Sequence, residues 1–239
     1  MTLSDTVPTR LIAIGDIHGQ LSMLNRLLDD VQPQSDDQFV FLGDYVDRGD
    51  DSRGVIDRLI KFQIDFPQTI FIRGNHDQFL LDALVEMGLR NGQRLREMST
   101  GYNRESFLTD MAIFLSNGGQ DTLESYHIDN LTAFPLNHVQ FLESTQFYWQ
   151  FEHFIFVHAG VEANISMDKQ DPYTLLWDRL NPPGENGVIH VVGHNPTGGQ
   201  PRFEDGCYHL DTGAVYGNSL TACDVFTRRI WQSKYKVRV

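Results

Sequence analysis

Cysteine is scarce in this sequence, which has only Cys207 and Cys223 among its 239 residues. A disulfide between them is one alternative, but two isolated cysteines without a secretion signal are more typical of free buried thiols. The first ten residues are polar and contain no apolar stretch. Long apolar runs are lacking too, since no segment approaches the roughly 18 residues that a membrane span requires. We therefore expect a soluble, cytoplasmic protein with no membrane partner.

Positive charge is also in short supply. Lysine and arginine number 19 against 32 aspartates and glutamates, which gives a formal net charge of −13. Broad binding to nucleic acid depends on clustered basic side chains, so we expect no nucleic-acid partner. The sequence has no internal repeat, low-complexity tract or linker. We predict a single domain that covers residues 1–239.

Three strand–loop–helix units occupy the first part of the sequence. Each begins with a short apolar run, at 10–14, 37–42 and 69–72, and continues through a polar loop into apolar residues at helical spacing. The helix of the second unit is expected at about 52–66, closed by Pro67. Repeated units of this kind predict parallel strands with helices on the faces of the sheet. Such sheets place their sites at the carboxyl ends of the strands.

The character of the sequence changes between about residues 88 and 150, where helices are expected at about 104–115 and 136–145. We interpret this part as a helical insertion beside the site and not as a separate domain. Strands return after it with little helical pattern between them, and residues 219–226 and 229–239 resemble a closing hairpin. The later strands therefore predict a second, more antiparallel sheet.

Chemically active residues gather in the loops that follow these strands. Two carboxylates and a guanidinium follow the second strand, in Gly43-Asp44-Tyr45-Val46-Asp47-Arg48-Gly49, where burial is costly unless a bound ligand compensates the charges. The strand ends together supply oxygen and imidazole donors without thiolates: Asp16, His18, Asp44, Asn75, His158 and His194. Such donors suit manganese, iron or zinc, and they are too many for one open catalytic ion. We predict two divalent metal ions, with manganese favoured and Asp44 shared between them.

The remaining loop residues fit the hydrolysis of a phosphate ester. Two ions about 3.5–4 Å apart can hold a hydroxide for in-line attack on phosphorus while they neutralise the phosphoryl oxygens. Arg48 and Arg73 can each bind phosphate oxygens, and His76 can protonate the leaving alkoxide. Asp47 would orient His76 and favour its protonated form.

The same loops form a specific set of motifs. Gly-Asp-Ile-His-Gly at 15–19, Gly-Asp-Tyr-Val-Asp-Arg-Gly at 43–49 and Arg-Gly-Asn-His-Asp at 73–77 resemble the signature blocks of the phosphoprotein phosphatase family of calcineurin-like metallophosphoesterases. His-Ala-Gly at 158–160 and Gly-His at 193–194 continue the resemblance over most of the chain. The resemblance implies an α/β fold in which two mixed β-sheets, flanked by helices, form a four-layer sandwich.

The resemblance also implies a role for each candidate residue. It divides the ligands between two metal sites that share one carboxylate: Asp16, His18 and Asp44 at the first, and Asp44, Asn75, His158 and His194 at the second. It makes His76 the general acid, with Asp47 as its partner. It implies three phosphate-binding arginines: Arg48, Arg73 and Arg179.

The sequence departs from the eukaryotic members of this family in two places. Asp77 ends the third block where they usually have Glu, and Asp-Thr-Gly-Ala-Val-Tyr-Gly at 211–217 stands where they have Ser-Ala-Pro-Asn-Tyr-Cys. The second feature resembles the bacterial and phage branch, which contains protein phosphatases of broad specificity and symmetrical diadenosine tetraphosphate hydrolases. His194 is followed by Asn195-Pro196 and not by a second histidine two positions on. This favours a monoester site over a phosphodiesterase.

We therefore predict a metal-dependent phosphomonoesterase, specifically a serine/threonine protein phosphatase that acts on phosphorylated proteins or peptides by direct attack, without a phosphoenzyme. The nearest alternative is a symmetrical diadenosine tetraphosphate hydrolase that uses the same site. A further alternative is a non-catalytic scaffold that binds phosphorylated partners, and the retained ligands, proton donor and arginines argue against it. The sequence identifies no regulatory partner for the insertion at 88–150.

Overall fold

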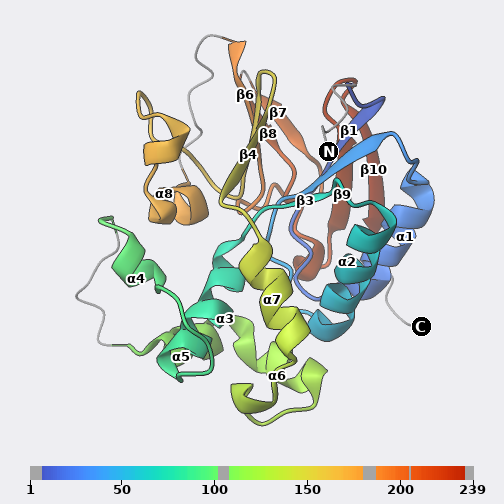
Figure 1. Cartoon of the computed structure of the whole chain (residues 1–239). Helices are drawn as coiled ribbons and strands as arrows, with labels where there is room; N and C mark the ends of the chain where they lie inside the picture. The colour runs from blue at the N-terminus through green and yellow to red at the C-terminus, as the bar shows by residue number, and fades with distance from the viewer. Residues whose placement is uncertain (1–6, 102–107, 180–186, 205, 235–239) are drawn as a thin grey trace.

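Two β-sheets form the centre of the computed structural model, which describes residues 7–101, 108–179, 187–204 and 206–234 (Figure 1). The first sheet contains, in spatial order, β10 (Arg229–Lys234), β9 (Ser219–Asp224), β1 (Arg10–Ile14), β2 (Asp37–Phe41) and β3 (Ile70–Phe71). The second contains β4 (Tyr148–Phe151), β5 (Phe154–Val157), β6 (Ile189–Val192), β8 (Cys207–His209) and β7 (Arg202–Glu204). The two sheets with their flanking helices confirm the predicted fold class.

The first sheet is built on the three predicted strand–helix units. Strands β1, β2 and β3 pair in parallel, and each is followed by a helix: α1 (Leu21–Val31), α2 (Ser52–Asp65) and α3 (Asn75–Glu86). Asp51 caps α2, because its side chain accepts a hydrogen bond of 2.7 Å from the Gly54 amide. The predicted units are confirmed, and they bring the loops after β1, β2 and β3 to the same end of the sheet.

The closing hairpin is also confirmed, although it completes the first sheet. Strands β9 and β10 pair in an antiparallel manner, and β9 pairs with β1. In the second sheet, β5, β6 and β8 are parallel, while β4 and β7 lie antiparallel at its edges. The expectation of a more antiparallel second sheet is therefore wrong. The connection from β5 to β6 contains only short helices among its described residues, such as η3 (Met167–Lys169) and α8 (Pro172–Trp177), and the connection from β6 to β8 contains β7. Parallel strands are therefore joined here without the long helices that the prediction required.

Alternating side chains of the central strands face two different cores. Ile12, Ile14, Phe39 and Phe41 pack with the apolar faces of the helices. Their neighbours Leu11, Ala13, Val40 and Leu42 pack against residues of the second sheet. A third cluster covers the outer face of the second sheet, beneath η3 and α8. Four layers result, and the strand ends of both sheets meet at the site.

The described part of the region between residues 88 and 150 contains helices and loops, and β4 begins at its end. It contains α4 (Leu95–Met98), α5 (Asp110–Phe114), the π-type turn η1 (Leu115–Gly119), α6 (Gln120–Tyr126), η2 (Leu131–Ala133) and α7 (Leu136–Ser144). The helix expected at 136–145 is confirmed, and α5 represents the end of the one expected at 104–115, part of which lies outside the described residues. In Figure 1 these helices surround α3: α4 and α5 lie to its left, α6 lies below it, and α7 lies to its right, towards α2.

Two further expectations concern the cysteines and the membrane. Cys207 and Cys223 are both buried and free, as predicted. Within the described ranges, every helix is too short or too polar to cross a bilayer.

Candidate metal centre and active site

The predicted site residues surround a small cavity at the carboxyl ends of the strands. The cavity has a volume of about 280 Å³, and its wall includes Asp16, His18, Asp44, Arg48, Asn75, His76, Arg179 and His194. His158 lies outside this wall but contacts Asn75, and Asp47 contacts His76. The structure thus brings together all but one of the predicted site residues, although they come from six separate segments of the chain.

Close backbone contacts hold the second and third loops together. Gly74 approaches Asp44 so closely that a Cβ atom at position 74 would lie 2.1 Å from Asp44 Oδ1. The Asp77 carboxylate accepts hydrogen bonds from the amides of Asp44 (2.9 Å), Tyr45 (3.0 Å) and Gly74 (2.8 Å). Asp77 therefore fixes the loop that carries Asp44 to the start of α3. Sequence reasoning noted Asp77 as a departure from the eukaryotic pattern but missed this task.

Electron-pair acceptors face one another at the proposed second metal site. The His158 Nδ1–H donates to the Leu42 carbonyl at 2.8 Å, which leaves Nε2 with its lone pair. That Nε2 lies 2.9 Å from Asn75 Oδ1 and 3.5 Å from an Asp44 oxygen. Three acceptors at these distances repel one another unless a cation lies between them. This donor set fits a divalent ion with nitrogen and oxygen ligands.

His194 completes this group from the loop after β6. Its Nδ1 lies 3.1 Å from Asn75 Oδ1, and its Nε2 is buried without a hydrogen-bond partner. Burial, together with the nearby His158, lowers the pKa of His194 to about 3. The imidazole is therefore neutral at physiological pH, which is the form that binds a metal.

The proposed first metal site lies on the other side of Asp44. The His18 Nδ1–H donates to the Val46 carbonyl at 2.8 Å, so that Nε2 faces an Asp44 oxygen at 3.3 Å. The Asp16 carboxylate accepts the His194 amide at 3.1 Å. Ligand atoms of His18, Asp44 and His76 lie within 4.8 Å of one another, as do those of Asp44, His158 and His194. Asp44 belongs to both groups.

The charges of the cavity wall also favour a cation. Burial, with the neighbouring Asp211 and Asp44, raises the pKa of Asp16 well above its ordinary value. Burial would do the same to Asp44, but His158, His76 and His18 surround it and hold its pKa well below that value. Buried carboxylates are costly without a positive partner. The residues present therefore fit a pair of divalent ions that share Asp44.

A buried acid–imidazole pair lies beside the proposed metal ligands. Asp47 Oδ2 and His76 Nδ1 are 2.8 Å apart, and the other Asp47 oxygen accepts a hydrogen bond of 2.6 Å from the Thr122 hydroxyl. Burial raises the pKa of Asp47 to about 8 and holds the pKa of His76 well below its ordinary value. Both shifts favour neutral groups, which argues against the expectation that Asp47 favours the protonated form of His76. In the neutral pair one proton lies between Asp47 Oδ2 and His76 Nδ1, and a second is on His76 Nε2.

Two arginines supply positive charge to the cavity. Arg48 donates a hydrogen bond of 2.9 Å to the Tyr216 hydroxyl, and the same nitrogen lies 3.3 Å from His18 Nε2. Arg179, which follows α8, also lines the cavity. Within the described ranges, neither guanidinium has a carboxylate at ion-pair distance. Both are therefore available to an anion such as phosphate.

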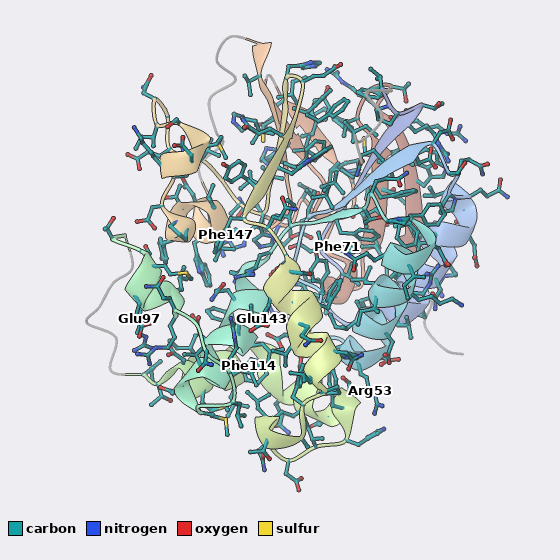
Figure 2. All side chains as sticks on the ribbon, viewed as in Figure 1. Arg53, Phe71, Glu97, Phe114, Glu143 and Phe147 are labelled. Atoms are coloured by element: carbon teal, nitrogen blue, oxygen red, sulfur yellow. The ribbon has the colours of Figure 1, made fainter. Side chains whose placement is uncertain are left out.

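Arg73 is the predicted site residue that the structure does not bring to the cavity. Its guanidinium donates to the Thr145 hydroxyl, to the Gln78 side chain and to carbonyls at the end of α7, at 2.9 to 3.2 Å. It also packs over the Phe147 ring; Figure 2 labels Phe147 and Glu143, one of the residues whose carbonyl it contacts. These contacts occupy its donors and contradict the prediction that it binds phosphate. Arg73 instead ties the third loop to α7.

Several cavity residues were not predicted. Asp211 follows β8, is buried and lines the cavity. Asn117, Trp177 and Tyr216 line it as well. The Asp-Thr-Gly-Ala-Val-Tyr-Gly segment at 211–217 was the available signal for Asp211 and Tyr216. Asn117 comes from the region 88–150, where the sequence carried no recognised motif. His209 lies on β8 and does not line the cavity.

Comparisons with known proteins agree on one family. The calcineurin-like phosphoesterase family matches residues 9–237. The chain is 30% identical to serine/threonine-protein phosphatase 1 of Salmonella typhimurium over 225 residues, which are 87% of this chain and 88% of that protein. It is 46% identical to serine/threonine-protein phosphatase PP1-delta of Caenorhabditis elegans over 68 residues, only 28% of this chain and 22% of that protein. A crystal structure titled "putative diadenosine tetraphosphatase" superposes with a TM-score of 0.66 at 22% identity, covering 97% of both chains.

Proposed function

We propose, starting from the fact that this chain belongs to the calcineurin-like phosphoesterase family, that it is a serine/threonine protein phosphatase dependent on two divalent metal ions. Membership of the family confirms the resemblance drawn from the motifs. The substrate class and the residue roles are our proposal, and the geometry of the cavity supports them.

One observation carries the proposal. A single cavity of about 280 Å³ combines an acceptor-rich cluster centred on Asp44, two arginines without carboxylate partners, and an imidazole backed by a carboxylate. Cations, an anion and a proton donor are what the hydrolysis of a phosphate monoester requires. A module that only binds phosphate needs neither the acid–imidazole pair nor the ligand cluster, so this combination argues against a non-catalytic scaffold.

The ligands would hold the two ions in the arrangement predicted above, with Asp44 shared between them. When bound, the ions would lower the pKa of a water molecule and neutralise phosphoryl oxygens. Manganese is the ion that we favour, because oxygen and imidazole ligands without thiolates suit it, as they also suit iron and zinc. Arg48 and Arg179 would bind the phosphoryl oxygens in the cavity.

His76 would donate the proton that the leaving group needs. A serine or threonine alkoxide is a poor leaving group, so proton transfer in the transition state accelerates its departure. The proton on His76 Nε2 can pass to that oxygen, while the proton shared with Asp47 moves onto His76 Nδ1 and leaves Asp47 as the carboxylate. Because the pair is neutral overall, His76 keeps its Nε2 proton until the leaving oxygen gains negative charge as its bond to phosphorus breaks.

Two observations support phosphoprotein over dinucleotide as the substrate. The relative from Salmonella typhimurium, which aligns with 87% of this chain, is named a serine/threonine-protein phosphatase. The cavity volume lies at or below the low end of small-molecule sites, which suits a phosphoryl group on a short side chain. A symmetrical diadenosine tetraphosphate hydrolase with the same site is the second candidate, since its metal and proton chemistry would be identical.

The proposal is tested by paired turnover assays on manganese-loaded protein. Phosphoserine and phosphothreonine peptides are compared with diadenosine tetraphosphate at equal concentrations, and kcat/KM is measured for each. We expect a higher kcat/KM for at least one peptide. Preferential cleavage of the dinucleotide to ADP would transfer the function to nucleotide hydrolysis. Inactivity towards both, with two ions bound, would refute the proposed enzyme.

A further inference from the structure

One helix of the region 88–150 braces the loop that carries the proposed catalytic acid pair. The Gly118 carbonyl accepts a hydrogen bond from the Arg48 amide at 3.3 Å. About two turns further along, the Ser125 hydroxyl accepts the Arg53 amide at 3.1 Å. Figure 2 labels Arg53 where α2 meets α6. Thr122 lies on α6 between these two contacts, so η1 and α6 together contact the end of the loop and the first turn of α2.

Thr122 makes the shortest of these contacts. It is completely buried, and its Oγ1 accepts the Asp47 amide at 2.9 Å and lies 2.6 Å from Asp47 Oδ1. A hydroxyl has one proton, and its lone pair already receives the amide N–H, so that proton is directed at the Asp47 carboxylate. The second Asp47 oxygen faces His76 Nδ1 at 2.8 Å. Thr122, Asp47 and His76 therefore form one continuous hydrogen-bonded series.

The two contacts of Thr122 differ in whether another residue can replace them. The Asp47 amide has a second acceptor, because the Ser52 hydroxyl lies 3.1 Å away. Asp47 Oδ1 has Thr122 as its one side-chain donor among the described residues. Loss of the Thr122 hydroxyl would thus leave the backbone of Asp47 supported and free its carboxylate to rotate. The carboxylate plane sets the direction of the hydrogen bond to His76.

We infer that Thr122 is a positioning residue for proton transfer, acting through Asp47 on the orientation of His76. The inference rests on the proposed function, since it concerns the general acid of that reaction. It also gives the region 88–150 a task in catalysis, beyond covering the cavity. Thr122 touches neither the cavity nor the proposed metal ligands, so its effect is confined to the protonation step.

The experiment compares three variants of the full-length, manganese-loaded protein. Thr122→Val removes the hydroxyl at nearly constant volume, Thr122→Ser restores a hydroxyl, and Ser125→Ala is a matched control that removes another hydroxyl from the same helix. Each is assayed with a phosphoserine peptide and with p-nitrophenyl phosphate. The alkoxide of the peptide needs protonation, whereas p-nitrophenolate is a stable leaving group that departs without it.

We expect Thr122→Val to lower kcat for the peptide by about 10–100-fold, the usual effect of losing a residue that orients a functional side chain. The loss with p-nitrophenyl phosphate should be less than about threefold, and KM should change little for either substrate. Thr122→Ser should recover most of the lost activity, and Ser125→Ala should resemble the unsubstituted protein. Metal content and Tm are measured for each variant. If Thr122→Val does not fold, Thr122→Ala removes the same hydroxyl with less bulk.

Three results would overturn the inference: equal losses with both substrates, no recovery in Thr122→Ser, or an equal loss in Ser125→Ala. Each would show that the hydroxyl supports folding only. Failure of the proposed function is recognised separately, because the unsubstituted protein would then release no phosphate from either substrate. That result would overturn the inference together with the function on which it rests.

Discussion

The sharpest test of the proposed mechanism is the substitution His76→Asn. The change removes the imidazole and leaves the backbone amide of residue 76, which donates to Asp44 Oδ1 at 3.0 Å. The loop that carries Asp44 therefore keeps its support, and the proposed metal ligands are untouched. The proton donor alone is lost, so turnover should fall while metal binding persists.

The expected size of the effect follows from the burial of His76. General-acid catalysis contributes about 10²–10⁴-fold, which corresponds to about 3–5 kcal/mol of transition-state stabilisation. His76 is only 1% exposed, so bulk water cannot readily replace its proton. We therefore expect a loss of about 10³-fold or more in kcat for a phosphoserine peptide, and about tenfold or less for p-nitrophenyl phosphate.

The assay measures kcat for both substrates together with the metal content of the purified variant. Metal content matters because ligand atoms of His76, His18 and Asp44 lie within 4.8 Å of one another. The His76 ring could thus reach an ion in the first site. Loss of one ion in the variant would show that His76 is a ligand and not the acid. Equal losses of turnover with both substrates would equally refute its assignment as proton donor.

Four further outcomes are expected. Arg48→Ala should raise KM for a phosphopeptide about tenfold or more, because its guanidinium faces the cavity. Arg73→Ala should leave KM unchanged, but the loss of its internal hydrogen bonds should lower the free energy of unfolding by about 2–4 kcal/mol in urea titrations. Burial raises the pKa of Asp82 to about 7, against about 4 when unfolded. The raised pKa stabilises the folded protein at acidic pH, and this contribution is lost as the pH rises from about 4 to 7. Asp82→Asn should therefore flatten the plot of Tm against pH over this range, and an unchanged plot would contradict the assignment. Chelation by EDTA should abolish turnover and lower Tm, and added manganese should reverse both.

The ligand loops could be predicted because each follows an apolar run. Asp16, Asp44 and Asn75 come directly after runs that form β1, β2 and β3, and parallel strands bring their carboxyl ends together. The parallel pairing of β5, β6 and β8 was not predicted. The irregular segments between these strands carry little periodicity, so they gave no sign that they cross over the sheet.

The direction of a side chain within a motif could not be predicted. Arg73 stands two residues before Asn75, yet its guanidinium turns towards carbonyls at the end of α7, about seventy positions later in the chain. Nothing near Arg73 in the sequence indicates where that helix end will lie. Thr122 was missed for the same reason, because its importance depends on contact with Asp47 in a distant loop.

The placement of the charges explains why two arginines of similar sequence context serve different ends. The buried guanidinium of Arg73 donates its hydrogen bonds to protein groups, including the Thr145 hydroxyl and backbone carbonyls, in place of water. Burial lowers its pKa to about 10. Arg48 keeps most of its donors towards the cavity and is held there by Tyr216 and by the backbone contact with Gly118. A phosphate ligand must exchange its hydration shell for protein donors, and only donors that have no internal acceptor offer a net gain. We therefore expect the guanidinium of Arg48, and not that of Arg73, to bind the phosphoryl group of a substrate.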